Sequence, residues 1–361
     1  MIRILHAADF HLDSPFAALA PEQAAQRREE QRQLVRRLAE ECGRLNCQLL
    51  LLAGDLFDSE QVYQETAELL TETLGGLQAQ VFIAPGNHDP WTLASPYAKL
   101  SWPGNVHIFH SKAVESVKLE DLGVIVYGAA FTEPHETGLL GSFLAHATDA
   151  PKLMVIHGTL DDPASPYNPI SEKEILASGL DYLALGHAHQ REIRTVGKTT
   201  VVNPGCPMGR GFDETGHKGV CYVELDRGVC KVTPLDLGAR VYETLSVSVG
   251  EDPLADIQAA LPENTERDLY RITLTGCCPP PNTAALKAAL ARRFYALELI
   301  DRTTPPSELW QDIEENSLKG EYLRQLKACY DGDEDQRTRG LVVQAVRIGL
   351  ALMEGREVPE L

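Results

Sequence analysis

Short apolar runs alternate with helical repeats over roughly the first 235 residues of the chain. The apolar runs have the length of buried strands and are predicted at residues 2–7, 48–53, 81–84, 124–129, 152–156 and 182–185. Helical periodicity is predicted over residues 21–42, 62–77 and 171–177, and Ser171 and Glu174 have the spacing of a capping box. Strands flanked by helices predict a layered α/β core.

Three later apolar runs, at 199–202, 220–225 and 229–233, have no helices between them, and we expect them to close the core as an antiparallel set. The composition then changes near 236–252. A helix, a strand, a helix and a strand follow at 256–261, 269–275, 283–293 and 295–300. The chain is therefore predicted to consist of a core over 1–240, a small α+β domain over 241–302, and a helical segment over 303–361.

The composition is that of a globular protein, with 43% hydrophobic residues among 361. A formal net charge of −19 repels polyanions on average, which argues against a dedicated nucleic-acid coat on this chain alone. The sequence has neither an apolar run of about 20 residues nor a signal-peptide pattern, so a cytoplasmic location is predicted. The eight cysteines form no C-x-x-C pair and are expected to be free thiols.

Polar clusters follow five of the predicted strands. They contain Asp9 and His11 (D-x-H), Asp55 and Asp58 (GDLFD), Asn87 and His88 (GNHD), His157 (VIHG), and His187 and His189 (GHAH). Ligand sites in α/β sheets form outside the carboxyl ends of the strands, so we expect all five clusters to meet at one edge. In D-x-H and H-x-H, alternate residues of an extended segment would point the same way.

These side chains offer oxygen and nitrogen ligands without a thiolate. Such a set suits Mn²⁺, Fe²⁺ or Mg²⁺, with Zn²⁺ also compatible. Two ions about 3.5–4 Å apart that share a carboxylate can stabilise both oxygens exchanged at a phosphate ester. The sequence therefore predicts a site for two divalent metal ions that acts on phosphate esters.

The ordered set D-x-H, GDxxD, GNHD, H, GHxH resembles the signature of calcineurin-like metallophosphoesterases over about residues 1–235. The resemblance implies a four-layer α/β core in which helices flank mixed β-sheets. It implies one metal held by Asp9, His11, Asp55 and His189, and a second held by Asp55, Asn87, His157 and His187. It further implies that His88 donates a proton to the leaving oxygen or stabilises the transition state, that Asp58 orients His88, and that Asp89 supports the loop.

A narrower resemblance rests on the stretches "ADFHLDSPF", "AGDLFD", "PGNHDPW", "WPGNVHIF" and "NPGCPMGRGFDETGHKG". They are similar to the YhaO/SbcD-type bacterial DNA repair exonuclease family. That resemblance implies a manganese-type phosphodiesterase that hydrolyses DNA as an exonuclease or endonuclease, a homodimer, and an SMC-like ATPase partner. It makes 241–302 a capping domain, and the terminal helices either dock the partner or pack on the cap.

Two other functions stay open at this point. The same metal site serves a phosphatase or phosphodiesterase acting on small molecules or phosphoproteins. A non-catalytic scaffold would usually lose metal ligands, and none is missing from the motif set. A high rate on a cyclic nucleotide beside negligible DNA cleavage would favour the first of these, and failure to bind Mn²⁺ would favour the second.

Several further residues have two interpretations. Arg210 and Lys218 either contact phosphate beside the metals or pair with Asp213 and Glu214, and phosphate contact is favoured for Arg210. Trp91 is a candidate for stacking on an unpaired base, or else packs locally in its loop. His6 and Asp13 are expected to be structural. Five histidines have no spacing partners and are assigned no role: His107, His110, His135, His146 and His217.

Overall fold

A computed structural model describes the chain except for residues 227, 251, 277, 279–280, 304–306, 333–335 and 356–361. Residues 1–210 and 217–239 form one compact unit, and residues 211–216 and 240–361 form another. The three-part division stays a prediction. The observed units differ from it at residues 211–216, which pack with the second unit because Gly216 donates its N–H to the carbonyl of Tyr242 at 3.0 Å and the ring of Phe212 contacts that of Tyr242.

Two six-stranded sheets form the first unit within the part of the chain that the structure describes. The first sheet has the order β14 (Val229–Leu235), β13 (Val220–Asp226), β1 (Ile2–Ala7), β2 (Leu49–Leu52), β3 (Gln80–Ile83), β4 (Val106–Ile108). Strands β1 to β4 run parallel, and β13 is antiparallel to both of its neighbours.

The second sheet has the order β11 (Glu192–Val196), β12 (Thr199–Asn203), β10 (Tyr182–Gly186), β7 (Lys152–His157), β6 (Val124–Gly128), β5 (Glu115–Leu119). The expectation that 199–202 joins a closing antiparallel set is wrong, because β12 pairs in parallel with β10. The tight β11–β12 hairpin places β12 beside β10 in the second sheet. Of the three strands expected in the antiparallel set, β13 and β14 therefore pair in the first sheet. A short ladder joins β8 (Thr159–Leu160) to β9 (Pro169–Ile170).

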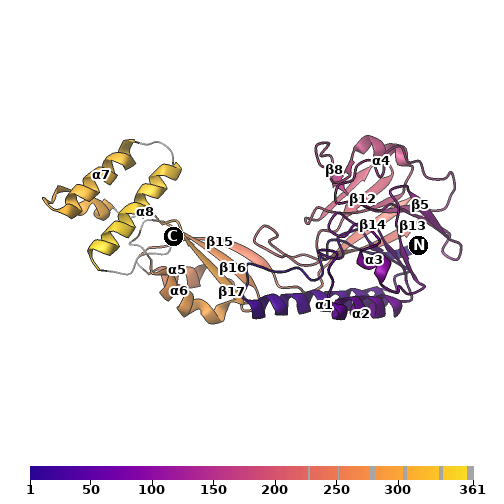
Figure 1. The fold of residues 1–361 in the computed structure, drawn as a ribbon, viewed down its shortest axis with the longest axis horizontal. Helices are drawn as coiled ribbons and strands as arrows, with labels where there is room; N and C mark the ends of the chain where they lie inside the picture. The colour runs from indigo at the N-terminus through magenta and orange to yellow at the C-terminus, as the bar shows by residue number, and fades with distance from the viewer. Residues whose placement is uncertain are drawn as a thin grey trace. The chain divides into compact units, whose positions relative to one another are not determined.

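Helices and sheets form four layers in this unit, and three apolar clusters lie between the layers. Side chains from the facing sheets, including Leu51, Val126 and Val155, form the central cluster. Helices α1 (Pro21–Arg44) and α2 (Gln64–Gly75) lie side by side (Figure 1) and pack on the outer face of the first sheet. The outer cluster of the second sheet includes Ile175 from α4 (Glu172–Ser178), whose predicted Ser171–Glu174 capping box is present. The fold class predicted from the sequence is confirmed.

The second unit contains a parallel sheet in the order β15 (Tyr242–Ser248), β16 (Leu269–Thr275), β17 (Ala296–Asp301). The other elements of the chain are the short α3 (Pro96–Lys99) in the first unit, and in the second α5 (Pro253–Ala260), α6 (Thr283–Leu290), α7 (Leu318–Gly332), α8 (Gln336–Met353) and the 3₁₀ turns Ala291–Arg293 and Ser307–Glu314. An ion pair between Arg347 and Asp301 joins α8 to the end of β17. Among the described residues, no helix combines the length and apolar character that crossing a membrane requires.

Candidate metal centre

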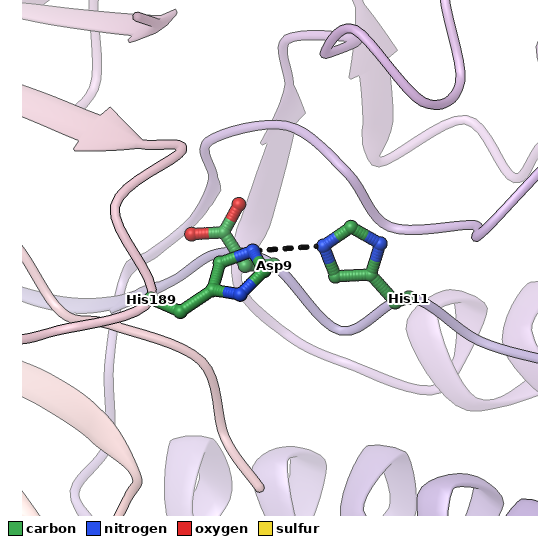
Figure 2. A group of neighbouring side chains, drawn as sticks. All are labelled: Asp9, His11 and His189. Carbon is green, nitrogen blue, oxygen red and sulfur yellow. Dashed lines mark hydrogen bonds between the residues drawn. The ribbon is translucent and has the colours of Figure 1, made fainter. Parts of the chain in front are cut away.

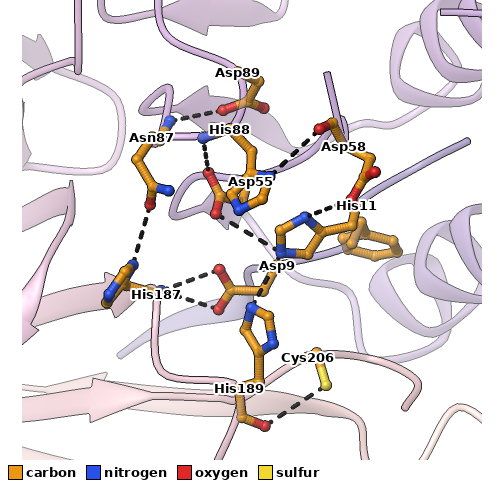
Figure 3. A network of polar contacts seen from close by, with 12 residues as sticks. Asp9, His11, Asp55, Asp58, Asn87, His88, Asp89, His187, His189 and Cys206 are labelled. Atoms are coloured by element: carbon orange, nitrogen blue, oxygen red, sulfur yellow. Dashed lines mark hydrogen bonds and ion pairs between the residues drawn. The ribbon is translucent and has the colours of Figure 1, made fainter. Parts of the chain in front are cut away.

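All seven predicted metal ligands lie at or just after carboxyl ends of strands and meet in one cluster, together with His88 and Asp58. Asp9 and His11 follow β1, Asp55 follows β2, and Asn87 follows β3. His157 ends β7, and His187 and His189 follow β10 in the facing sheet. Figure 3 shows side chains from both sheets converging there. The predicted convergence is therefore present in the structure.

Four of these ligands lie on backbone that is bent sharply rather than extended. Asp9, His11 and Asp55 have φ angles of 55°, 45° and 50°, and His187 has 95°. The prediction that an extended D-x-H segment aligns Asp9 with His11 is therefore wrong. The loop after β1 instead pairs with the loop after β2, as Asp9 N–H donates to the carbonyl of Gly54 at 3.0 Å and His11 N–H to that of Asp55 at 2.9 Å. This strained backbone persists because neighbouring segments hold it.

One set of ligand atoms gathers around Asp9, His11 and His189 (Figure 2). Their ligand atoms all lie within 4.8 Å of one another. The Nε2 atoms of His11 and His189 face each other at 3.0 Å. Both carboxylate oxygens of Asp9 accept the N–H of His187 at 3.0 Å, which fixes this carboxylate beside the two rings. We call Asp9, His11, Asp55 and His189 metal group one.

A second set surrounds the side-chain oxygen of Asn87. That oxygen lies 3.0 Å from His157 Nε2 and 3.1 Å from His187 Nδ1. His157 donates its other ring nitrogen, Nδ1, to the carbonyl of Ala53 at 2.9 Å. Metal-binding histidines are commonly oriented by such a contact to a backbone carbonyl. We call Asp55, Asn87, His157 and His187 metal group two.

Asp55 lies between the two groups. Its Oδ2 atom is 3.7 Å from His11 Nε2 and 3.5 Å from His157 Nε2. Its Oδ1 atom accepts the backbone N–H of His88 at 2.9 Å. Gly86 packs so closely here that a Cβ atom on it would lie 2.2 Å from Oδ1. The carboxylate is thus confined to the position that a bridging ligand needs.

Burial and mutual charge shift the pKa values of this cluster in opposite directions. Burial raises the pKa of Asp9 to about 7. Burial also opposes the charged form of His157, yet the carboxylates of Asp55 and Asp9 raise the His157 pKa to about 9. Burial lowers the pKa of His11 and of His187 to about 4. Buried carboxylates beside the neutral imidazoles of His11 and His187 fit divalent cations, which would neutralise the acidic charge, displace the proton of His157 and take the imidazole lone pairs.

Asp58 takes a different position from the one predicted. Its carboxylate lies 3.2 Å from His11 Nδ1 and accepts from Arg210 Nη1 at 2.9 Å. Its backbone carbonyl, and not its carboxylate, faces His88 Nδ1 at 3.4 Å. The carboxylate therefore orients His11, because the GDLFD loop turns it toward β1. The exposed His88 ring meets the His11 ring edge-on, with their centroids 4.7 Å apart.

Arg210 closes a ring of polar contacts around metal group one. Besides Asp58, its guanidinium approaches His189 Nδ1 at 3.4 Å, and His189 in turn faces His11. Arg210 thus contacts the predicted ligand His189 directly and the predicted ligand His11 through Asp58. Its predicted contact with substrate phosphate stays a prediction.

The aromatic residues after GNHD pack into the protein. Trp91 is half-buried against two apolar clusters and lies 5.6 Å from the His110 ring, which favours local packing over base stacking. Tyr97 donates its hydroxyl to Asp89 at 2.5 Å. Asp89 also accepts the backbone N–H groups of Phe57 and Gly86, so its predicted loop-supporting position is observed.

Two residues that support the site were not anticipated from the sequence. Gln31 on α1 donates to the carbonyl of His11 at 2.8 Å, and Arg27 donates to that of Gly209 at 2.9 Å. Both side chains are buried, although the Arg/Glu-rich α1 sequence suggests an exposed, salt-bridged helix face. Their spacing of four residues, in line with the buried Leu34, Val35 and Leu38, is the pattern that could have indicated an inward face.

The two residues expected to be structural have such roles. Fully buried His6 contacts the hydroxyl of Tyr182 at 2.9 Å and the carbonyl of Leu185 at 3.1 Å, and so connects β1 with β10. Asp13 serves the start of α2, where it accepts the N–H of Tyr63 and the hydroxyl of Thr66. Neither residue binds within the two metal groups.

The family of the chain follows from comparison with known proteins. The calcineurin-like phosphoesterase superfamily domain matches residues 2–228, so the chain belongs to this superfamily. It is therefore a metallophosphoesterase, a hydrolase of a family that binds two divalent metal ions, and its clustered Asp and His side chains are candidate ligands.

Among particular relatives, the chain is 32% identical over 239 residues to the uncharacterized metallophosphoesterase YhaO of Bacillus subtilis (strain 168), covering 63% of this chain and 58% of YhaO. It is 27% identical over 254 residues to the DNA double-strand break repair protein Mre11 of Methanopyrus kandleri, covering 63% of this chain and 55% of Mre11. The match thus spans less than two thirds of either relative. A solved archaeal phosphodiesterase, 15% identical, covers 65% of this chain and 100% of its own, with a TM-score of 0.35.

Proposed function

We propose that this chain is a manganese-type, two-metal phosphodiesterase that hydrolyses DNA, acting in the cytoplasm as a repair exonuclease or endonuclease. The observation that carries the proposal is the placement of Asp55 between His11 and His157, at the junction of two complete ligand groups. Similarity to a protein named for double-strand break repair supports DNA as the substrate. A homodimer and an SMC-like ATPase partner belong to the same proposal.

The metal groups and His88 would contribute different steps of phosphate diester hydrolysis. Two divalent ions held by these groups would activate water near neutral pH and neutralise charge on the phosphate diester. His88 lies over His11, and its Nδ1 faces the carbonyl of Asp58. In the imidazolium form of His88, Nδ1 donates to that carbonyl and Nε2 holds the proton that would pass to the leaving oxygen. Since His88 is exposed, a substrate can reach this atom.

Cleavage of an end-labelled DNA duplex with Mn²⁺ tests the proposal. The wild-type chain is expected to cleave it, and His88→Ala is expected to lose about 10²–10⁴-fold in rate, the usual contribution of a general acid. Metal content, measured by mass spectrometry, should stay at the wild-type value in this variant. His217→Ala, which changes an exposed histidine outside the cluster, serves as the matched control.

Metal-loaded protein that cleaves no form of DNA would contradict the proposal. A high rate on a small phosphate ester or phosphoprotein under the same conditions would then identify the other substrate class. Repeating the DNA cleavage assay with a candidate SMC-like ATPase and ATP tests the proposed partner. A partner with a basic DNA surface would offset the net charge of −19 and so favour DNA binding.

A further inference from the structure

Two cysteines contact each other where α1 ends and β2 begins. Cys42 lies in the last turn of α1, and Cys47 lies just before the first residue of β2. Both are free thiols, and only 2% and 7% of their surfaces are exposed. The Cys47 thiol donates a hydrogen bond to the Cys42 sulfur. The metal groups form at the opposite, carboxyl ends of the strands, so this thiol pair is a separate feature of the first unit.

The way in which α1 ends holds the two thiols together. Asn46 has a φ angle of 49°, and its N–H donates to the carbonyl of Gly43 at 3.0 Å. The N–H of Cys47 donates to the carbonyl of Cys42 at 2.9 Å. These two bonds and the left-handed Asn46 define a Schellman motif, in which the side chains near the two ends of the turn contact each other. In this chain, both of those side chains are cysteines.

A cleft gives small molecules access to the thiol pair. It has a volume of about 1000 Å³, and both cysteines line it. Lys118 also lines the cleft, but it pairs with Glu120 at 2.8 Å. Four carboxylates surround the same space: Glu40, Glu72, Glu120 and Asp121. This excess of negative charge repels anions such as glutathione disulfide and leaves the cleft open to a small neutral oxidant.

We propose that Cys42 and Cys47 form an oxidation site, at which hydrogen peroxide converts the two thiols into a disulfide. The Cys42 thiolate attacks one peroxide oxygen, the O–O bond breaks, and the departing hydroxide takes up the proton that Cys42 has released. Cys42 is then a sulfenic acid. The Cys47 sulfur attacks the Cys42 sulfur, the S–S bond forms, and the S–O bond breaks as the hydroxyl leaves with the Cys47 proton as water. The two thiols thus lose two electrons, and one peroxide becomes two water molecules.

The hydrogen bond between the thiols assigns their roles. It lowers the pKa of Cys42 and raises the pKa of Cys47. The thiolate is the reactive form of cysteine, so Cys42 attacks the peroxide and Cys47 completes the disulfide. Elsewhere in the same sheet, burial raises the pKa of Cys221 on β13 to about 11, so this thiol should react slowly.

The disulfide would fasten the end of α1 to the start of β2 in the unit that contains the metal groups. A cross-link that fits the native geometry stabilises a protein mainly by restricting its unfolded chain. For the short loop between Cys42 and Cys47, we expect oxidation to raise the unfolding temperature of the first unit by about 4–8 °C. Reduction with dithiothreitol should reverse this shift.

Peptide mapping of the full chain tests the disulfide. Reduced protein is treated with hydrogen peroxide, its remaining thiols are blocked with N-ethylmaleimide, and it is digested with trypsin. Trypsin cleaves after Arg44, so the peptide with Cys42 and the peptide with Cys47 stay joined only through a disulfide. We expect the joined peptides at peroxide exposures that leave Cys221 reduced, and dithiothreitol should separate them.

Single variants separate the two roles. In Cys47→Ser, whose hydroxyl can still donate to Cys42, the sulfenic acid should persist on Cys42 and react with dimedone. In Cys42→Ser, Cys47 should stay largely unlabelled. Neither variant should gain thermal stability on oxidation. Cys221→Ala is the matched control, because it removes a buried cysteine of the same unit and should retain both the disulfide and the temperature shift.

Three outcomes would count against the proposal. Absence of the joined peptides from the wild type, with exposed Cys329 fully oxidised, would overturn it without requiring any variant to fold. A disulfide from Cys42 or Cys47 to any other cysteine would overturn it too. Joined peptides without a rise in the unfolding temperature would contradict the stabilising effect and support the oxidation site alone. None of these results depends on the substrate of the metal groups, so the proposed function is tested separately.

Discussion

At the scale of single residues, Asp58 and Arg210 orient the ligands of metal group one from outside. Asp58 contacts His11 Nδ1, and Arg210 contacts both Asp58 and His189. A carboxylate on the outer nitrogen of a metal-binding histidine fixes the ring and raises its basicity. These partners could not be predicted from the motif alone, because the spacing of GDLFD does not show which way the final carboxylate turns.

We expect Asp58→Ala to weaken Mn²⁺ binding at metal group one about 10- to 100-fold, the usual effect of removing such an orienting group. Isothermal titration with Mn²⁺ measures it directly. Asp149→Ala removes an exposed carboxylate elsewhere in the same unit and should leave the affinity unchanged. Equal affinities in all three proteins would show that Asp58 does not position His11.

Buried His6 makes the stability of the protein depend on pH. Burial lowers its pKa from 6.5 to about 3, although the hydrogen bond with the Leu185 carbonyl opposes this. As the pH falls from about 6.5 to about 3, the unfolded chain binds a proton at His6 that the folded chain does not. Stability is therefore lost on acidification, by about 2 kcal/mol between pH 7 and pH 5 from this residue.

Urea unfolding at pH 7 and pH 5 tests this contribution. His6→Gln, which keeps polar atoms for Tyr182 and Leu185 but cannot titrate, should lose about 2 kcal/mol less than the wild type between the two pH values. An identical pH dependence in both proteins would mean that the folded chain accepts the proton on His6.

At the scale of elements, the tight loops after β2 and β3 bring the ligands together. The convergence of these side chains could be predicted from the sequence, because buried parallel strands and the polar residues after them are both visible there. Their assignment as metal ligands came from the family resemblance and stays a prediction. The left-handed conformations of Asp9 and His11 were not visible, since they depend on pairing between two loops distant in the chain. Strands β4, β5, β11 and β15 were missed, being short or only partly buried.

Gly86→Ala should destabilise the loop after β3, because its added Cβ would lie 2.2 Å from Asp55 Oδ1 and force that carboxylate to move. We expect a loss of about 1–3 kcal/mol in the free energy of unfolding together with weaker metal binding. Gly104→Ala is the matched control, since a Cβ there meets no atom within 4 Å. It should change stability by no more than about 0.5 kcal/mol. Equal stability and metal affinity in the two variants would contradict the close packing at Asp55.

At the scale of the whole molecule, only one of the two compact units contains the metal groups. The change in composition predicts a boundary at residue 240, and the first compact unit ends at residue 239. The sequence does not show that residues 211–216 pack with the second unit, because their contacts with Tyr242 are tertiary.

Mn²⁺ should raise the unfolding temperature of the first unit and leave the transition of the second unit unchanged. A ligand that binds only the native state adds about 2.7 kcal/mol of stability at 100 times its Kd. Differential scanning calorimetry with Mn²⁺ and with EDTA measures the shift, which Asp55→Asn should largely remove. A Mn²⁺ effect of equal size in Asp55→Asn would place the ion elsewhere.

Anomalous X-ray diffraction from crystals soaked in Mn²⁺ tests the shared metal site most directly. We predict two manganese peaks about 3.5–4 Å apart, with Asp55 between them, one beside His11 and His189 and the other beside Asn87 and His157. A single peak, or two peaks that do not share Asp55, would contradict the two-metal centre.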